Sequence, residues 1–471
     1  MSELSGYWIT RFVFQKGLAL VYLIAFAAVV NQFIPLLGEE GLLPVPDFVK
    51  RARFRESPSL FLFVPKDSAF RVGGWAGVLL SCVALSGIAD SHSWSLIATW
   101  SLLWLIYLSF VNVGQTFYAF GWESILLESG FFTIFSGPSG AEPQMLLIWI
   151  WRWILFRVMF GAGMIKLRAD PCWRELTCLD YHFETQPMPN PLSWYFHWLP
   201  AWAHKGGVLF NHFVELIVPF GYFAPQPIAA VAGLLTIVFQ GILILSGNLS
   251  WLNWVTIVLA LTTLDDSFLR HVRPVPVPAT HPPAFAWQLT IWILAAIVLW
   301  LSVEPVRNML SSRQLMNYSY NPLQLVNTYG AFGGVTRTRY EIVIEGTTES
   351  FVLPGTKWQE YEFKGKPGST ARTPPQIAPY HLRLDWLMWF AAMRPGDVPL
   401  WFLRFVRKLL QGDKCALSLL KTNLFGATPP HHIRALLYQY NFTSPQERRR
   451  TGQWWKRTLV STYLSASALP K

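Results

Sequence analysis

Apolar runs long enough to cross a bilayer recur through the first 300 residues and then cease, and this pattern constrains the fold most. A membrane-spanning helix needs ~20 predominantly apolar residues. The segment 115–135 either spans the bilayer or re-enters it, so we expect eight or nine crossings. The other predicted spans are 17–37, 72–89, 96–113, 144–166, 208–224, 228–245, 249–264 and 286–303.

Charge content supports a division into two regions. Only 14% of the residues are charged, whereas an average soluble domain has roughly 25%. We predict a helical transmembrane domain over 1–303 and a soluble α+β domain over 304–471. The net charge of +11 is spread without a single basic patch, which favours the lipid bilayer as a partner and gives no indication of nucleic-acid binding.

The soluble region contains both strand and helix patterns. Period-two alternation predicts strands at 339–346 and 357–364. The run 383–393 predicts an apolar helix that carries Trp386 and Trp389. Further short helices are predicted at 401–411, 415–421 and 432–440. These patterns predict a small α+β domain.

Charged residues interrupt two of the apolar segments. Glu123 and Glu128 lie within 115–135, and Arg152 and Arg157 lie within the following span. Charges at membrane depth are costly unless they are paired or face water. We therefore predict an intramembrane polar network in which the acid pair on one helix faces the basic pair on its neighbour. Such a network is either structural or part of a functional polar site.

A polar loop, 167–207, separates two spans and contains the pair Cys172 and Cys178. Their spacing fits neither a zinc knuckle nor a thioredoxin-like motif. They form a disulfide if the loop faces an oxidising compartment, and are packed free thiols otherwise. In the next helix Asn211, His212 and Glu215 share one face. They predict a buried hydrogen-bond cluster or a substrate or proton role, and two ligands are too few for a metal on their own. We predict no metal and no cofactor.

Long stretches of the chain resemble the lipase maturation factor family. The first are GAGMIKLRADPCWRELTCLDYHFETQPMPNPLSWYFHWLP, NHFVELIVPF and SGNLSWLNW, and the tail adds LVNTYGAFGGVTRTRYEIVIEGT, WQEYEFKGKPG and IAPYHLRLDWLMWFAAM. The resemblance implies a polytopic membrane protein that helps secreted dimeric lipases to fold and assemble. It implies the endoplasmic reticulum membrane in a eukaryote and the cytoplasmic membrane in a bacterium.

The same resemblance implies that the loop and the tail contact a secreted lipase-like client through aromatic surface. A chaperone of this kind needs exposed apolar area and no catalytic constellation. A lipid bound in a polar-lined cavity is a further expected partner. The residues expected to bind the client are Trp173, Tyr181, Trp194, His197, Tyr329, Phe332, Trp386 and Trp389.

A second, more distant resemblance gives an alternative function. The motif GAGMIKL, followed by a Trp seven residues after Lys166, is similar to the membrane domain of vitamin K-dependent gamma-carboxylase-like proteins. This similarity implies that Lys166 acts as a general base on a lipid-soluble or peptide substrate, with His212 and Glu215 completing the site. The alternative is a lysine that snorkels from a helix end. The sequence favours a protein that is not an enzyme.

Overall fold

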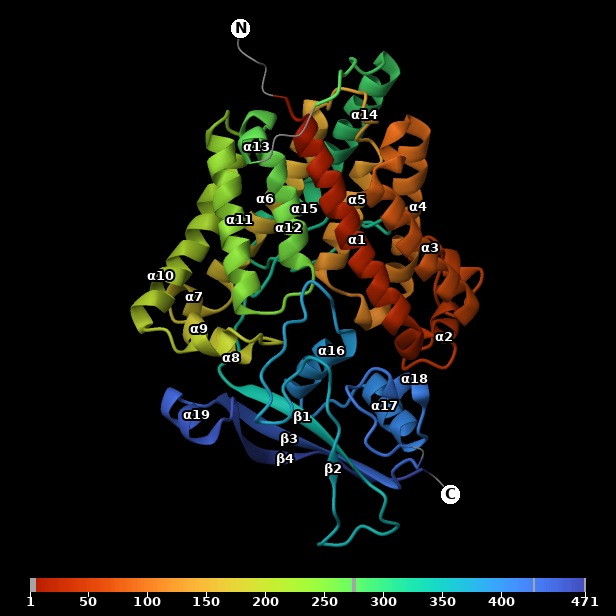
Figure 1. Cartoon of the computed structure of the whole chain (residues 1–471), viewed down its shortest axis with the longest axis vertical. Coiled ribbons are helices and arrows are strands. Elements are labelled where there is room, and N and C mark those ends of the chain that lie inside the picture. Colours follow the sequence, from red (N-terminus) through yellow and green to blue (C-terminus); the bar gives the residue numbers. More distant parts are fainter. Residues whose placement is uncertain (1–5, 273–276, 427, 470–471) are drawn as a thin grey trace.

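The computed structural model describes residues 6–272, 277–426 and 428–469. It consists of a bundle of membrane helices with a four-stranded sheet beneath one end (Figure 1). This architecture confirms the predicted class, a polytopic helical membrane protein with a smaller α+β part. Within the described residues, seven helices are long and apolar enough to span a membrane: Trp8–Leu37, Asp67–Ser86, Ser93–Val113, Met145–Arg168, Ala201–Phe223, Ile228–Ser246 and Phe285–Leu310.

Helix α1 (Trp8–Leu37) runs diagonally through the bundle and reaches the C-terminal part (Figure 1). Its 30 residues correspond to about 45 Å at 1.5 Å per residue, more than the roughly 30 Å hydrocarbon core of a bilayer. The helix is apolar on all sides, as expected for a buried helix. Tyr22 and Phe26 pack edge-to-face on the Tyr107 ring, at 5.7 and 5.3 Å between centroids.

Two apolar helices inside the bundle are shorter than a full span. They are α5 (Gly121–Thr133) and α12 (Leu252–Ala260), the latter extended by the turn η6 (Leu261–Thr263). Helix α5 lies within the predicted segment 115–135 and is almost entirely buried. A Cβ atom at Gly130 would collide with the Tyr22 hydroxyl, so the glycine allows α5 to lie close against α1.

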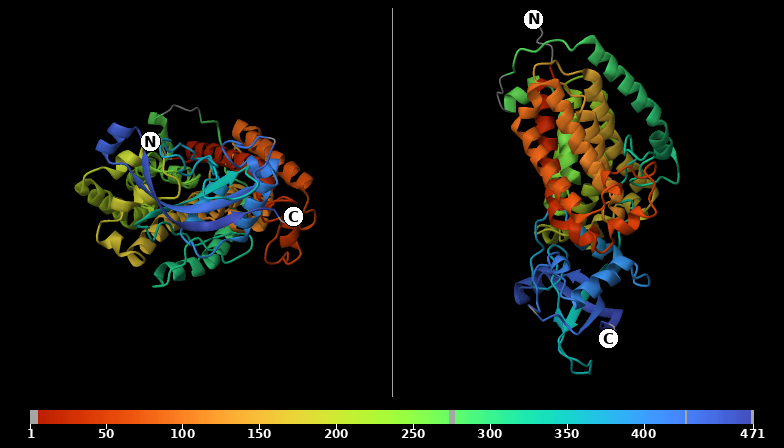
Figure 2. Two further views of the ribbon diagram at one scale, coloured as in Figure 1. Left: turned by 90° about the horizontal axis from the view of Figure 1, so that it is seen from below. Right: turned by 90° about the vertical axis from the view of Figure 1, so that its right-hand side faces the viewer.

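The remaining spans are α3 (Asp67–Ser86), α4 (Ser93–Val113), α6 (Met145–Arg168), α11 (Ile228–Ser246) and two composite helices. The first composite helix joins α10 (Ala201–His212), the π-helical turn η4 (Phe213–Ile217) and η5 (Val218–Phe223); the second joins α14 (Phe285–Leu301) and α15 (Val303–Leu310). Helix α14 lies along the outer flank of the bundle (Figure 2).

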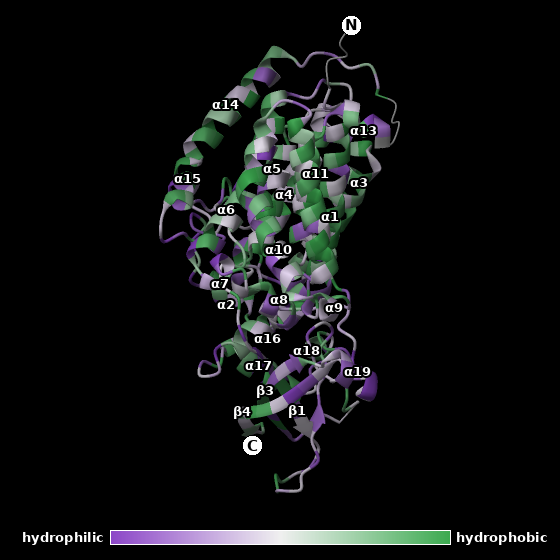
Figure 3. Cartoon of the chain, turned by 90° about the vertical axis from the view of Figure 1, so that its left-hand side faces the viewer, coloured by the Kyte–Doolittle hydropathy of each residue, from purple (hydrophilic) through white to green (hydrophobic). Residues whose placement is uncertain are grey.

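The flanks of the bundle expose apolar side chains, as a lipid-facing surface requires. On the span that contains α10, the exposed residues recur every three or four positions: Leu209, Phe213, Ile217 and Phe220. Figure 3 shows hydrophobic residues concentrated in the bundle, while hydrophilic residues are frequent in the sheet and its loops. This distribution places the bundle in the bilayer and the sheet outside it.

The sheet is antiparallel throughout, in the order β2-β1-β3-β4. Its strands are β1 (Arg339–Thr347), β2 (Gln359–Glu360), β3 (His432–Phe442) and β4 (Trp455–Ser467). The helix prediction for 432–440 is wrong. This segment is β3, and its residues Ile433, Ala435 and Leu437 alternate toward the core and pair with β1.

The other helices connect the bundle to the sheet or cover it. Helix α16 (Arg383–Ala392) packs on β1, and the loop helices α8 and α9 lie between the bundle and the sheet (Figure 1). The remaining helices are α2 (Val45–Val49), α7 (Pro171–Arg174), α8 (Leu179–Thr185), α9 (Ser193–His197), α13 (Asp266–Val272), α17 (Leu400–Leu410), α18 (Lys414–Leu417) and α19 (Pro445–Thr451).

Candidate functional site

The predicted polar network is present in the bundle, but its pairing differs from the prediction. Glu128 and Arg157 form a buried ion pair. Glu123 instead pairs with Arg383 of α16, with 2.6 Å between Oε1 and Nη1. Arg152 has no carboxylate partner among the described residues and donates to the Thr262 and Tyr222 carbonyls and the Tyr7 hydroxyl.

Helix geometry explains this correction. Glu123 and Glu128 are five residues apart on α5, and Arg152 and Arg157 are five apart on α6. Five residues rotate an α-helix by about 500°, so the two side chains point about 140° apart. The two acids therefore cannot both face the same neighbouring helix, and each finds a partner on a different element.

Both buried acids hold C-terminal segments onto the bundle. The Glu128 carboxylate accepts hydrogen bonds from the Asn327 backbone N–H at 3.0 Å and from the Tyr329 hydroxyl at 2.7 Å. Arg383 donates to the Phe117 carbonyl at 2.7 Å and lies 3.5 Å from the centroid of the Tyr118 ring. The sequence did not indicate these partners, since they are 199 and more residues from the acids they bind.

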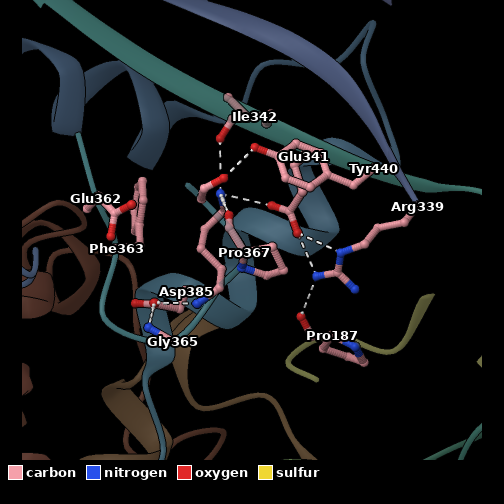
Figure 4. Close-up of polar contacts among 12 residues, drawn as sticks. Pro187, Arg339, Glu341, Ile342, Glu362, Phe363, Gly365, Pro367, Asp385 and Tyr440 are labelled. Atoms are coloured by element: carbon pink, nitrogen blue, oxygen red, sulfur yellow. Dashed lines mark hydrogen bonds and ion pairs between the residues drawn. The ribbon is translucent and has the colours of Figure 1, made fainter. Parts of the chain in front are cut away.

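The loop is tied to the sheet by a buried arginine. Arg339, at the start of β1, donates to the Glu341 carboxylate and to the backbone carbonyls of Glu184 and Pro187, both at 3.0 Å. The Glu341 carboxylate also pairs with the ammonium of Lys366 at 2.9 Å. Figure 4 shows Arg339 between Glu341 and Pro187. Loop and sheet thus share one fully buried polar cluster.

The first part of the loop is closed covalently. Cys172 and Cys178 form a disulfide and are buried against Trp173 and Val208. Asp170 caps α7 and pairs with Arg337 at 2.8 Å, which lowers the pKa of Asp170 to about 2. This ion pair links the loop to the segment that precedes β1.

Lys166 lies in a compact polar cluster at the end of α6. Its ammonium is 2.5 Å from Glu215 Oε1 and 3.1 Å from Asn211 Oδ1, and it lies 5.1 Å from the centroid of the Trp173 ring. Asn211 also donates to Glu215 at 2.9 Å. Glu215 reaches this position from the π-helical turn η4, a feature that occurs often at functional sites.

His212 does not join Lys166 and Glu215. Its Nε2 atom is 3.0 Å from the Trp173 carbonyl, so it supports the loop backbone. The Glu215 carboxylate, the Asn211 amide and the Trp173 ring contact the Lys166 ammonium, whose side chain is 6% exposed. These contacts join two helices and the loop. Within the described ranges, no group of three His, Cys, Asp or Glu side chains is placed to hold a metal.

Four of the eight residues predicted to contact a client are buried. Trp173, Trp194, Tyr329 and Trp386 are at most 7% exposed. Trp194 donates to the Thr443 carbonyl at 2.8 Å, and Trp386 packs edge-to-face on a bundle tryptophan. These side chains hold the loop, tail and bundle together and do not form the expected exposed surface.

The other four predicted contact residues are partly exposed, and each also has a partner within the structure. They are Tyr181, His197, Phe332 and Trp389. Trp389 donates to the Thr185 carbonyl at 3.0 Å, and Phe332 packs edge-to-face on the His182 ring.

Outside the lipid-facing flanks, apolar side chains are also exposed in the loop between β1 and β2. The loop between β1 and β2 extends farthest from the bundle (Figure 1) and exposes Phe351 by 78%, Val352 by 44% and Leu353 by 65%. Its turn is fixed by two hydrogen bonds between Leu353 and Thr356. We call residues 351–353 the hairpin tip. The sequence signal is an FVL run followed directly by the turn residues Pro-Gly.

Comparisons with known proteins cover nearly the entire chain. The family model described as the lipase maturation factor transmembrane domain matches residues 9–271, and that of the lipase maturation factor C-terminal domain matches residues 325–465. No solved structure matches the chain.

Named relatives agree with the family models. Mouse lipase maturation factor 1 is 42% identical over 97% of this chain and 87% of its own length, and the human protein of that name is 41% identical over 98% and 88%. Human lipase maturation factor 2 is 30% identical over 99% and 84%. The chain belongs to the lipase maturation factor family.

Proposed function

We propose that this chain is a membrane-embedded maturation factor that assists the folding and assembly of secreted lipases or similar exported proteins. One structural observation supports the proposal beyond family membership. The C-terminal part is held on one end of the bundle by the buried Glu123–Arg383 pair and by the hydrogen bonds of Glu128, and the loop 167–207 is held on the sheet by hydrogen bonds from Arg339 to its backbone carbonyls. They form one rigid platform on one side of the membrane, where a client can bind while it folds.

The platform is proposed to face the lumen of the endoplasmic reticulum. The Cys172–Cys178 disulfide supports this orientation, because disulfides persist in oxidising compartments. New glycosylation sequons test it. Pro354→Asn creates Asn-Gly-Thr next to the hairpin tip, and Ser91→Asn creates Asn-His-Ser at the opposite end of the bundle. The proposal predicts a glycan at position 354 and none at 91; the reverse pattern would contradict it.

We also propose that the hairpin tip is a point of contact with the client. It is apolar, ordered by its turn and directed away from the bilayer, so it is not covered by lipid or by the bundle. Exposed apolar side chains at such a position are typical of protein-binding sites. A client that has not completed its own apolar core offers the matching surface.

Complementation tests the proposed function directly. Cells that lack their own maturation factor would be given a secreted dimeric lipase with or without this chain. The activity and the amount of secreted lipase would then be measured separately. We expect this chain to raise the specific activity of the secreted enzyme. Equal specific activity in both cultures, with the chain inserted at normal levels, would contradict the proposal.

A further inference from the structure

A cavity of about 370 Å³ opens at the junction between α1 and the C-terminal part. Asn31 lines it from α1, six residues before that helix ends, and Leu419 lines it from just beyond α18. Because α1 is longer than the bilayer core, its last two turns leave the hydrocarbon region here. The cavity therefore lies at the depth of the phospholipid headgroups, and its volume falls in the range of small-molecule sites.

Asp385 supplies a negative group to this cavity. Its side chain is 1% exposed and lines the cavity. Oδ1 accepts hydrogen bonds from the backbone N–H groups of Gly365 at 2.6 Å and Lys366 at 3.0 Å. Oδ2 has no hydrogen-bond donor among the residues that the structure describes. Burial raises the pKa of Asp385, because a carboxylate removed from water with an open oxygen is costly until a donor reaches it.

Lys364 supplies a positive group on another part of the wall. Its ammonium donates to the Ser418 carbonyl at 2.5 Å, and no carboxylate pairs with it within the described ranges. The Tyr380 hydroxyl accepts hydrogen bonds from Asn31 at 3.3 Å and Gln32 at 3.1 Å. Its own hydrogen therefore remains available to an acceptor in the cavity.

We propose that this cavity binds an amine–phosphate zwitterion, the headgroup of an ethanolamine phospholipid from the surrounding bilayer. The ammonium donates to Asp385 Oδ2, and the phosphate accepts from the Lys364 ammonium and the Tyr380 hydroxyl. Leucine side chains at positions 382, 384 and 419 form the apolar part of the wall. The lipid binds here whether or not a client protein is present.

The donor requirement of Asp385 makes the site selective. A primary ammonium has N–H groups for the open carboxylate oxygen, whereas the quaternary ammonium of choline has none. A glycerol headgroup has no positive charge to offer a buried carboxylate. The site thus distinguishes three phospholipids that carry the same phosphate and the same acyl chains.

Lipid retention by the purified full-length protein tests the proposal. Delipidated protein in detergent would be mixed with phosphatidylethanolamine, phosphatidylcholine or phosphatidylglycerol of identical chains, and bound lipid would be measured by native mass spectrometry. We expect the ethanolamine lipid to be retained about tenfold better than the other two. Equal retention of ethanolamine and choline lipids would overturn the proposal. Soluble phosphoethanolamine binding as tightly as the lipid would overturn the lipid source and uphold the zwitterion site.

Asp385→Asn is the decisive variant. Asparagine keeps an oxygen for the N–H groups of Gly365 and Lys366 but replaces the open carboxylate oxygen with an amide donor, so the fold is preserved. We expect this variant to lose the preference for the ethanolamine lipid. Lys364→Met removes a contact to the phosphate that all three lipids share, so it should lower the retention of all three. The matched control Asp397→Asn removes an exposed carboxylate from the loop after α16 and should bind like the wild type. Unchanged retention in Asp385→Asn would refute the assignment.

Discussion

Two buried ion pairs in this protein have similar chemistry but connect different parts of the structure. Lys166 and Glu215 are 49 residues apart, and both lie in the membrane region beside the loop. Glu123 and Arg383 are 260 residues apart, and join the centre of the bundle to a helix of the C-terminal part. The first pair stabilises contacts within the membrane region beside the loop. The second pair fixes the position of the C-terminal part on the bundle. Similar local chemistry therefore predicts different consequences on mutation.

The largest effect is expected from breaking the long-range pair. Arg383→Met leaves Glu123 buried at 0% exposure without its cation, and losing one partner of a buried pair costs about 3–5 kcal/mol. We expect the C-terminal part to detach, and limited proteolysis in detergent to cleave within 311–338. Arg394→Met changes an exposed arginine just beyond the same helix and should stay resistant. Resistance of Arg383→Met would show that the pair does not hold the parts together.

Breaking the local Lys166–Glu215 pair should lower stability but leave lipase maturation per folded molecule unchanged. Lys166→Met leaves the buried Glu215 carboxylate without its cation, so we expect a loss of about 3–5 kcal/mol in the free energy of unfolding. Because Lys166 has no substrate to deprotonate in this account, lipase maturation per folded molecule should stay unchanged. Thermal unfolding and complementation of the same preparations measure the two quantities. Lost maturation at wild-type stability would instead support the enzyme alternative.

A smaller effect is expected at the hairpin tip, which has no role in either pair. Phe351→Ser with Leu353→Ser removes apolar surface that the fold does not bury, so stability should change by no more than about 0.5 kcal/mol. We expect lipase maturation in the complementation assay to fall about fivefold, as when a binding hot spot of about 1 kcal/mol is lost. Leu459→Ser, at a 55% exposed site on β4, is the matched control. Identical maturation by both variants would show that the hairpin tip does not contact the client.

The smallest effect is a pH dependence at the loop. Arg337 lowers the pKa of Asp170 to about 2, below the value of about 3.9 in an unfolded chain. The contribution of Asp170 is therefore complete above about pH 4 and is lost as the pH falls toward 2. Arg337 is 43% exposed, so screening by solvent reduces the contribution to about 1 kcal/mol. Thermal unfolding of the wild type and of Asp170→Asn should converge at pH 2, and curves that stay parallel would contradict this assignment.

Local patterns explain what the sequence predicted correctly. Runs of apolar residues identified the long spans, and alternation identified β1, because both depend on neighbouring residues alone. The failure at β3 has the same origin: HIRALLYQY contains good helix formers, and its alternation becomes decisive only through pairing with β1. Tertiary partners overrode the local preference.

For the candidate site, the sequence identified residues but not their partners or their burial. Glu123 was correctly identified as needing a partner, but nothing near it in the sequence points to Arg383. The aromatic residues of the loop and tail are large and clustered, and they were predicted to bind a client. Trp194 and Trp386 are nevertheless buried and pack inside the fold. A short exposed run such as 351–353 has no periodicity and becomes visible only when the fold shows that nothing covers it.

A double-mutant cycle in the complementation assay tests whether the C-terminal part acts only when no unpaired charge is buried between it and the bundle, the condition that the Glu123–Arg383 pair meets. Secreted lipase activity would be compared for the wild type, Arg383→Met, Glu123→Gln and the double variant at matched expression. We expect Arg383→Met to abolish maturation and Glu123→Gln in the same chain to restore part of it, since no unpaired charge is then buried. Full maturation by Arg383→Met alone would contradict the account.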